Sequence, residues 1–179
     1  MKTITTHLFS FNELETEAQD KVIEILASYR DVEQQTNEAM ESLKAIAEAM
    51  GTRLTDWSLG PDPHRAKAKV ANSFDEGHRL TADFVRCLIE NGYSRPKRFA
   101  DMEFPGICGF TGVCYDETAA ESILEALIQG ETMDQAFSQA AQALSRELEA
   151  ELDYQQSRES ILEYLDTSEE IYSADGEEA

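Results

Sequence analysis

The chain has 179 residues, enough for one ordinary domain with a real core, and its 41% hydrophobic content excludes a chain too polar to fold. Its 36 acidic and 15 basic residues give a net charge of −21, which excludes binding of nucleic acid or an anionic membrane through the surface as a whole. No segment approaches the roughly 18 apolar residues of a membrane span. Three cysteines form an odd number that does not indicate a disulfide framework. We therefore expect a soluble cytoplasmic protein with no membrane association.

The first third of the chain predicts one strand and two helices. Residues 3–9 alternate apolar and polar side chains, as a short strand does. Residues 16–19 have the form of a capping box and precede apolar residues at helical spacing, which predicts a helix over 17–29. A second helix is predicted over 33–50, with Gly51 at the left-handed position that often ends a helix. The apolar stripe expected on the first helix consists of Ala18, Val22, Ile25, Leu26 and Tyr29.

The middle of the chain predicts a hairpin, a helix and loops. Residues 52–59 and 67–74 read as strands separated by a proline-containing turn, and so short a connection favours antiparallel pairing. A third helix is predicted over 79–91, and residues 93–115 are expected to form irregular loops. Residues 53–98 contain nine of the basic residues. We interpret these as neutralising acidic helices within the molecule, while direct nucleic-acid contact through this segment stays open.

The C-terminal part is predicted to be almost wholly helical. Asp116 is expected to cap a helix that ends at Gly130, and a long helix is expected to open at Thr132 or Met133. Ser157 can cap a last helix, after which residues 169–179 form a tail with a short strand at 171–172 and a turn at 174–176.

These elements predict a helix-rich α+β fold with a small antiparallel sheet, built from the N-terminal and central strands, and a helical C-terminal half. The expected parts are an α+β portion over residues 1–115, an acidic helical portion packed on it over 116–170 and an acidic tail over 171–179. We expect these parts to form one domain.

Residues that could carry chemistry are scattered. Cys108 and Cys114 are six residues apart, whereas a structural zinc knuckle needs two to four, and no close histidine pair completes a site. Glu76 and His78 could form an acid/base pair in principle, but two ionisable residues in a polar stretch are usually solvated, so we give this pair little weight. The glycine-rich segment 104–117 is interpreted as a tightly packed turn, with a contact surface as the alternative. We predict no enzymatic activity, no cofactor and no metal.

The strongest signal is acidic. Residues 147–179 carry twelve carboxylates and one cation, Arg158. Four helical residues advance about 6 Å, and phosphates along a duplex strand recur every ~3.4 Å, so carboxylates at this pitch could occupy alternate phosphate positions in a basic groove. A solvated helix face is the alternative, and it stays open. The predicted partner-binding residues are Glu147, Glu149, Glu151, Asp153, Glu159, Glu163, Asp166, Glu169 and Glu170.

Three segments also carry a resemblance. Residues 9–21 (FSFNELETEAQDK), 108–117 (CGFTGVCYDE) and 153–163 (DYQQSRESILE) resemble a family of small acidic proteins of bacteriophages, prophages and gut metagenomes, some loosely described as antitoxin-like. Residues 53–100 depart most from that pattern, and the family offers no active site to transfer.

The resemblance implies a phage protein acting in the cytoplasm of a bacterial host. It implies a non-enzymatic inhibitor of a host nucleic-acid-targeting defence enzyme, a DNA mimic of the anti-CRISPR kind. The expected partner is an effector with a basic nucleic-acid groove, with a Cas9-type CRISPR nuclease favoured. The alternative is an antitoxin-like or assembly module that binds one phage or host protein through apolar contacts.

Overall fold

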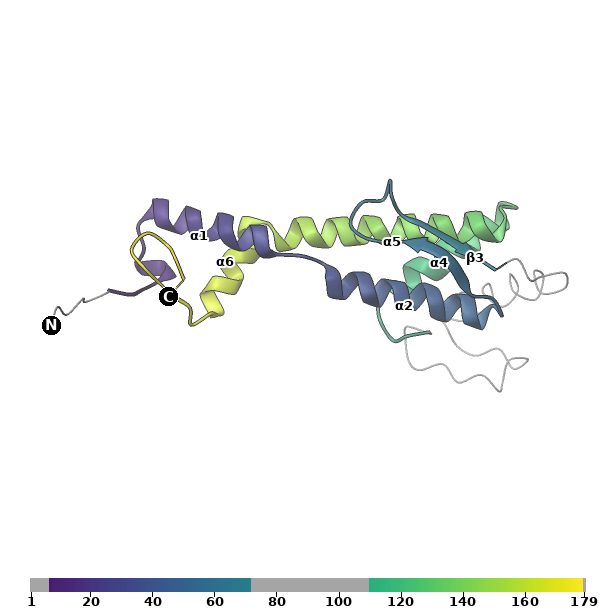
Figure 1. Ribbon diagram of the computed structural model, residues 1–179, viewed down its shortest axis with the longest axis horizontal. Coiled ribbons are helices and arrows are strands. Elements are labelled where there is room, and N and C mark those ends of the chain that lie inside the picture. Colours follow the sequence, from purple (N-terminus) through teal and green to yellow (C-terminus); the bar gives the residue numbers. More distant parts are fainter. Residues whose placement is uncertain (1–6, 72–109, 179) are drawn as a thin grey trace. The chain divides into compact units, whose positions relative to one another are not determined.

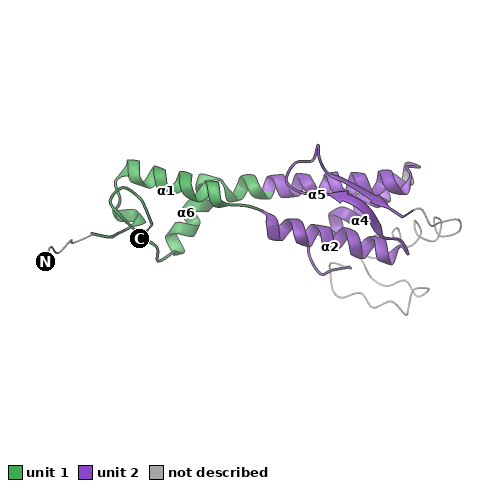
Figure 2. Cartoon of the chain, in the orientation of Figure 1, with its two compact units in different colours: residues 1–31, 151–179 green, residues 32–150 purple. Residues whose placement is uncertain are grey.

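The computed structural model describes residues 7–71 and 110–178, and the chain divides into two compact units (Figures 1 and 2). Unit 1 consists of residues 1–31 and 151–179, and unit 2 of residues 32–150. These boundaries do not coincide with the expected ones at 115/116 and 170/171. The helix-rich α+β class is confirmed, because helices occur together with two small antiparallel sheets. Within the described ranges, no helix is both long and apolar enough to cross a membrane.

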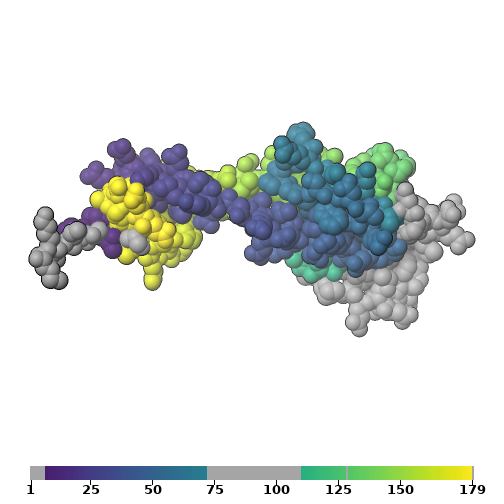
Figure 3. All heavy atoms as spheres, in the orientation of Figure 1, coloured from purple at the N-terminus to yellow at the C-terminus, as the bar shows by residue number. Residues whose placement is uncertain are grey.

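Unit 1 joins the two ends of the described chain. Its elements are β1 (Phe9–Ser10), the 3-10 helix η1 (Phe11–Glu13), α1 (Thr16–Tyr29), the end of α5 (Met133–Gln155), α6 (Arg158–Thr167) and β4 (Ile171–Tyr172). Strands β1 and β4 pair antiparallel, with Phe9 opposite Tyr172. The space-filling view accordingly shows N-terminal and C-terminal residues side by side, in purple and yellow (Figure 3).

The sheet prediction is therefore wrong in one respect. The N-terminal strand pairs with the C-terminal strand, which brings Tyr172 into the core beside Phe11, and the central strands form a separate sheet. The β1 strand also begins later than predicted, and residues 3–6 of the expected strand lie outside the described part of the chain.

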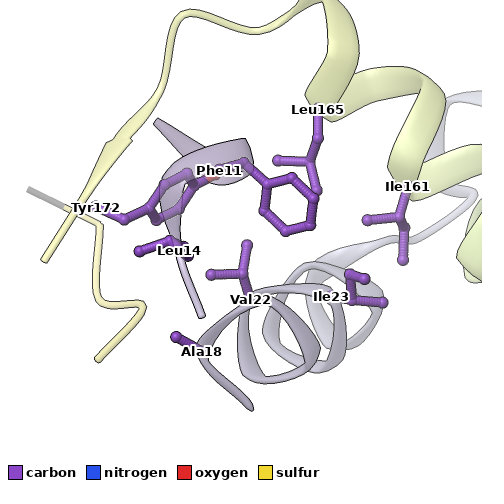
Figure 4. Packing of buried hydrophobic residues seen from close by; sticks show 8 residues of the cluster. All are labelled: Phe11, Leu14, Ala18, Val22, Ile23, Ile161, Leu165 and Tyr172. Carbon is purple, nitrogen blue, oxygen red and sulfur yellow. The ribbon is translucent and has the colours of Figure 1, made fainter. Parts of the chain in front are cut away.

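The core of unit 1 lies between α1, α6 and β4 (Figure 4). Its buried side chains point toward one another and come from Phe11, Leu14, Ala18, Val22, Ile23, Ile161, Leu165 and Tyr172. The predicted α1 stripe is only half confirmed. Ile25 and Tyr29 are exposed, because the covering side chains pack toward Ile23, Leu26 and Ala27 on the second half of the helix.

The start of α1 also differs from its prediction. Glu15 occupies the N-cap position without a side-chain hydrogen bond, and Thr16 is the first helical residue. The side-chain amide of Gln19 instead donates to the Phe11 carbonyl at 3.2 Å. The capping-box arrangement falls six residues earlier, at η1, where the backbone N–H and the hydroxyl of Ser10 donate to Glu13 at 2.9 and 3.0 Å. The hydrogen bond from the Ser10 backbone lowers the pKa of Glu13 most, and the bond from the Ser10 hydroxyl lowers it further.

Unit 2 contains α2 (Glu33–Ala49), β2 (Leu54–Ser58), β3 (Lys67–Val70), α4 (Tyr115–Ile128) and most of α5. The predicted antiparallel hairpin is confirmed, and so is the left-handed Gly51 that follows α2. Gly130, at the predicted end of α4, is also left-handed. Strand β3 is held to α5, since Val70 donates its amide to Asp134 at 3.0 Å and Ser138 donates to the Ala68 carbonyl at 2.7 Å. The predicted helix over 79–91 lies outside the described residues.

Asp116 has a different role from the predicted cap. It lies in the first turn of α4, after Cys114 as the N-cap residue, and it is fully buried. Its carboxylate accepts backbone hydrogen bonds from Phe110, Thr111 and Gly112 at 2.7–3.2 Å, and also the Thr111 hydroxyl at 2.8 Å. The carboxylate therefore holds the preceding turn, which agrees with a packed turn for the described part of segment 104–117.

Candidate protein-binding surface on unit 1

The residues considered for metal binding or catalysis form no such site within the described ranges. No group of three or more His, Cys, Asp or Glu side chains there could hold a metal ion. Cys114 is exposed at the start of α4, and His64 is exposed in the loop between β2 and β3. Cys108, Glu76 and His78 lie outside the described residues.

Unit 1 carries most of the excess negative charge. Its two segments contain sixteen acidic and four basic residues, so the unit has a net charge of −12. Unit 2 has nearly twice the length and a net charge of −9. Fourteen of the sixteen carboxylates of unit 1 are exposed. The acidic residues near both ends of the chain thus share one compact unit.

The described basic side chains of unit 1 are all engaged inside the unit. Arg158 pairs with Asp20 at 2.8 Å, and Lys21 donates to the Asp175 carbonyl at 3.1 Å. The Arg30 guanidinium lies over the Tyr164 ring, 4.6 Å from its centroid. In addition, the last turns of α1, α5 and α6 contain no basic residue, although helix C-termini favour cations. Little positive charge remains in the described part of the unit to balance its carboxylates.

One predicted site residue, Glu170, serves the fold. Its two carboxylate oxygens accept hydrogen bonds from the hydroxyls of Tyr164 and Tyr172, the latter at 2.6 Å. Burial raises the pKa of Tyr172, and the hydrogen bond to Glu170 raises it further. Because Tyr172 belongs to the core of unit 1, Glu170 joins β4 to α6 and is not available to a partner without a loss of these bonds.

Three other predicted residues accept a hydrogen bond while staying at the surface. Thr118 donates to Glu147, Gln155 donates to Glu151 at 2.7 Å, and Tyr154 donates to Glu163 at 3.2 Å. The remaining five are exposed and make no hydrogen bond or ion pair with any residue that the structure describes. They are Glu149, Asp153, Glu159, Asp166 and Glu169.

The nine residues do not form one continuous row. With 3.6 residues per turn, Glu149 and Asp153 lie about 200° around α5 from Glu147 and Glu151. Glu147 and Glu149 also belong to unit 2, whereas the other seven belong to unit 1. We therefore define the acidic surface as the exposed residues of α5, α6 and the following turn in unit 1, namely Asp153, Glu159, Glu163, Asp166 and Glu169.

Unit 1 also exposes most of the large hydrophobic side chains that lie at the surface, which the sequence did not indicate. Seven of the eight in the described residues belong to it, and only Trp57 belongs to unit 2. The seven are Leu8, Ile25, Tyr29, Tyr154, Leu162, Tyr164 and Ile171. Helical periodicity predicted that Ile25 and Tyr29 face a core. They are exposed because the residues of α6 and β4 that cover α1 pack on other positions of the helix.

Comparisons of the chain with protein-family models, with curated proteins and with solved structures found no match. The function is therefore inferred from the charge, exposure and contacts of unit 1.

Proposed function

We propose that this chain is a non-enzymatic protein that binds, through unit 1, the basic nucleic-acid groove of another protein and blocks it. The observation that carries the proposal is the net charge of −12 in a unit whose described basic side chains are already engaged. Grooves that hold nucleic acid by its backbone are strongly positive. A surface of unbalanced carboxylates is complementary to such a groove, and that complementarity speeds association and confers specificity.

The partner favoured by the family resemblance is a host defence effector, in particular a Cas9-type CRISPR nuclease. In that setting the chain would be a phage inhibitor of the anti-CRISPR kind, acting in the bacterial cytoplasm. A channel that accepts a nucleic-acid heteroduplex has the positive charge that complements an acidic helical unit.

Charge reversal tests this proposal. Asp153, Glu159 and Asp166 are exposed and free of hydrogen bonds to described residues, so replacing all three by lysine leaves the contacts of the fold intact. We expect the triple variant to lose inhibition of DNA cleavage by a sensitive effector, and to lose capture of that effector from a bacterial lysate at low salt. Wild-type capture should weaken at high salt, because salt screens exposed charges.

A matched control is available on unit 2. Three carboxylates there are exposed and accept no hydrogen bond from a described residue, namely Glu48, Glu121 and Glu125. Replacing all three by lysine changes the net charge by the same amount as the acidic-surface reversal. This control variant should inhibit as the wild type does. Equal inhibition by both triple variants and the wild type would contradict a role for the acidic surface.

The second candidate is an antitoxin-like or assembly module that binds through apolar contacts. The exposed hydrophobic side chains of unit 1 favour it. Such binding would resist high salt and survive the acidic-surface reversal, and it would be lost when Ile25 and Leu162 are replaced by serine. The same capture experiment therefore separates the two candidates.

A further inference from the structure

Three exposed tyrosines lie at the end of unit 1 where α1, α5 and α6 meet. Tyr29 is 78% exposed, Tyr154 51% and Tyr164 38%, and we call them the tyrosine surface. The helices that carry them are linked by direct contacts. Gln156 donates its side-chain amide to the Arg30 carbonyl at 3.5 Å, and the Arg30 side chain reaches the Tyr164 ring.

The ring of Tyr154 has anionic neighbours. Its hydroxyl donates to Glu163 at 3.2 Å. That hydrogen bond raises the pKa of Tyr154, and the charge of Glu159 raises it further. Both carboxylates belong to the acidic surface. A cation placed on this ring would therefore meet a π face and carboxylate oxygens at the same time.

The protein already contains one such arrangement. Arg30 lies over Tyr164, whose hydroxyl donates to Glu170. A guanidinium is suited to this environment because its plane stacks on an aromatic ring while its N–H groups at the edge donate to carboxylates. A lysine ammonium is a compact charge without a plane to stack, so it gains less from the ring.

We propose that the tyrosine surface binds arginine side chains of the partner protein. The ring of Tyr154 would stack on a guanidinium group whose hydrogen bonds the acidic surface accepts, and the exposed ring of Tyr29 would offer a second stacking face. This inference rests on the proposed function and names the chemistry of the contact. Tyrosine and arginine are also the residues that most often dominate the binding energy of protein interfaces.

Arginine and lysine peptides of equal length test the inference, because they carry the same charge. Binding of fluorescently labelled oligo-arginine and oligo-lysine to the full chain is measured by anisotropy. We expect oligo-arginine to bind about tenfold more tightly, from two stacked guanidinium groups. Replacing Tyr29 and Tyr154 by alanine should abolish this difference, because oligo-arginine should lose much more affinity than oligo-lysine.

Two control variants separate stacking from other effects. The Tyr29→Phe, Tyr154→Phe variant keeps both rings and should keep the preference for arginine. Trp57 is an exposed aromatic residue of unit 2, 46% exposed, and Trp57→Ala should also keep the preference. The acidic-surface reversal should weaken both peptides, and oligo-arginine by at least as large a factor, because its guanidinium groups also lose their carboxylate acceptors.

Each other outcome contradicts a defined part of the proposal. Equal, salt-sensitive binding of the two peptides to the wild type would overturn the arginine inference and support the acidic surface alone. A preference that survives the double alanine variant would also overturn the inference. If neither peptide binds, both the inference and the electrostatic basis of the proposed function fail.

Discussion

At the scale of single residues, Gly176 shows how closely the C-terminal turn packs on α1. Its φ is +79°, a conformation that side chains rarely adopt. A Cβ atom there would lie 2.8 Å from the Ala18 carbonyl oxygen and 3.1 Å from a methyl group of Val22. Glycine is therefore required at position 176 for two reasons, the backbone conformation there and the close approach of α1.

Gly130→Ala provides the comparison that separates these two requirements. Gly130 has a similar φ of +85°, but a Cβ atom added there would meet no other atom within 4 Å. We expect Gly130→Ala to cost only the backbone strain, about 1–2 kcal/mol. Gly176→Ala should cost about 1–3 kcal/mol more, because the extra methyl group overpacks the contact with α1. Hydrogen exchange of α4 amides in the first variant and α1 amides in the second measures these losses, and equal losses would contradict the close approach.

Glu170 illustrates at the same scale what the sequence could not reveal about the candidate site. The density of carboxylates after residue 147 was visible in the sequence, and it predicted a charged surface. Which carboxylates remain available depends on tyrosines that approach from α6 and β4, and these approaches are set by tertiary packing. Local spacing could not therefore distinguish Glu170, which joins elements of the fold, from Glu159, which is exposed.

At the scale of elements, helix ends give a direct test of capping. Ser157 precedes α6, and its hydroxyl accepts a hydrogen bond from the Ser160 amide at 3.2 Å, as its sequence context predicted. Thr16 has a similar sequence context, but it is the first residue of α1 and does not precede it. Its hydroxyl makes no hydrogen bond to a described residue.

We therefore expect the two alanine substitutions to differ. Ser157→Ala should lower the free energy of unfolding by about 1 kcal/mol, because an amide at the start of α6 loses its partner. Thr16→Ala should change it by less than about 0.5 kcal/mol, as for an ordinary surface position. Urea unfolding followed by circular dichroism measures both values. A larger loss in Thr16→Ala than in Ser157→Ala would show that α1 begins differently in solution.

The helices could largely be predicted from the sequence, and the pairing of elements could not. The repeat of apolar residues in α2 and the left-handed Gly51 after it are local signals, and both predictions were confirmed. The β1–β4 pairing joins the two ends of the chain, and two residues such as Phe9 and Ser10 carry too little pattern to identify a partner. The local pattern is also insufficient for Tyr29. It continues the apolar stripe of α1, but no part of the core extends far enough along the helix to bury it.

At the scale of the whole molecule, the charge of unit 1 opposes its own compact state. The net charge of −12 repels itself, and the few described ion pairs of the unit, such as Arg158 with Asp20, are exposed and weak. Salt screens the repulsion and the ion pairs alike, but the repulsive contacts are more numerous.

We therefore expect added sodium chloride to stabilise unit 1 more than unit 2. Hydrogen exchange of the amides of α1 and α6 should slow markedly between low and moderate salt, whereas exchange of α4 amides should change less. An equal slowing in both units would point to a general salt effect and contradict the assignment of the repulsion to unit 1.

The antiparallel joining of the chain's two ends also has a consequence for synthesis. Asp20 and Arg158 are 138 residues apart, and a ribosome adding about 5–20 residues per second makes the second roughly 7–28 s after the first. Until then Val22 and Ile23 have no α6 to cover them, so we expect nascent α1 to expose apolar side chains to chaperones and proteases. A product truncated before α6 would keep this face exposed, and we expect it to be degraded faster than the full chain.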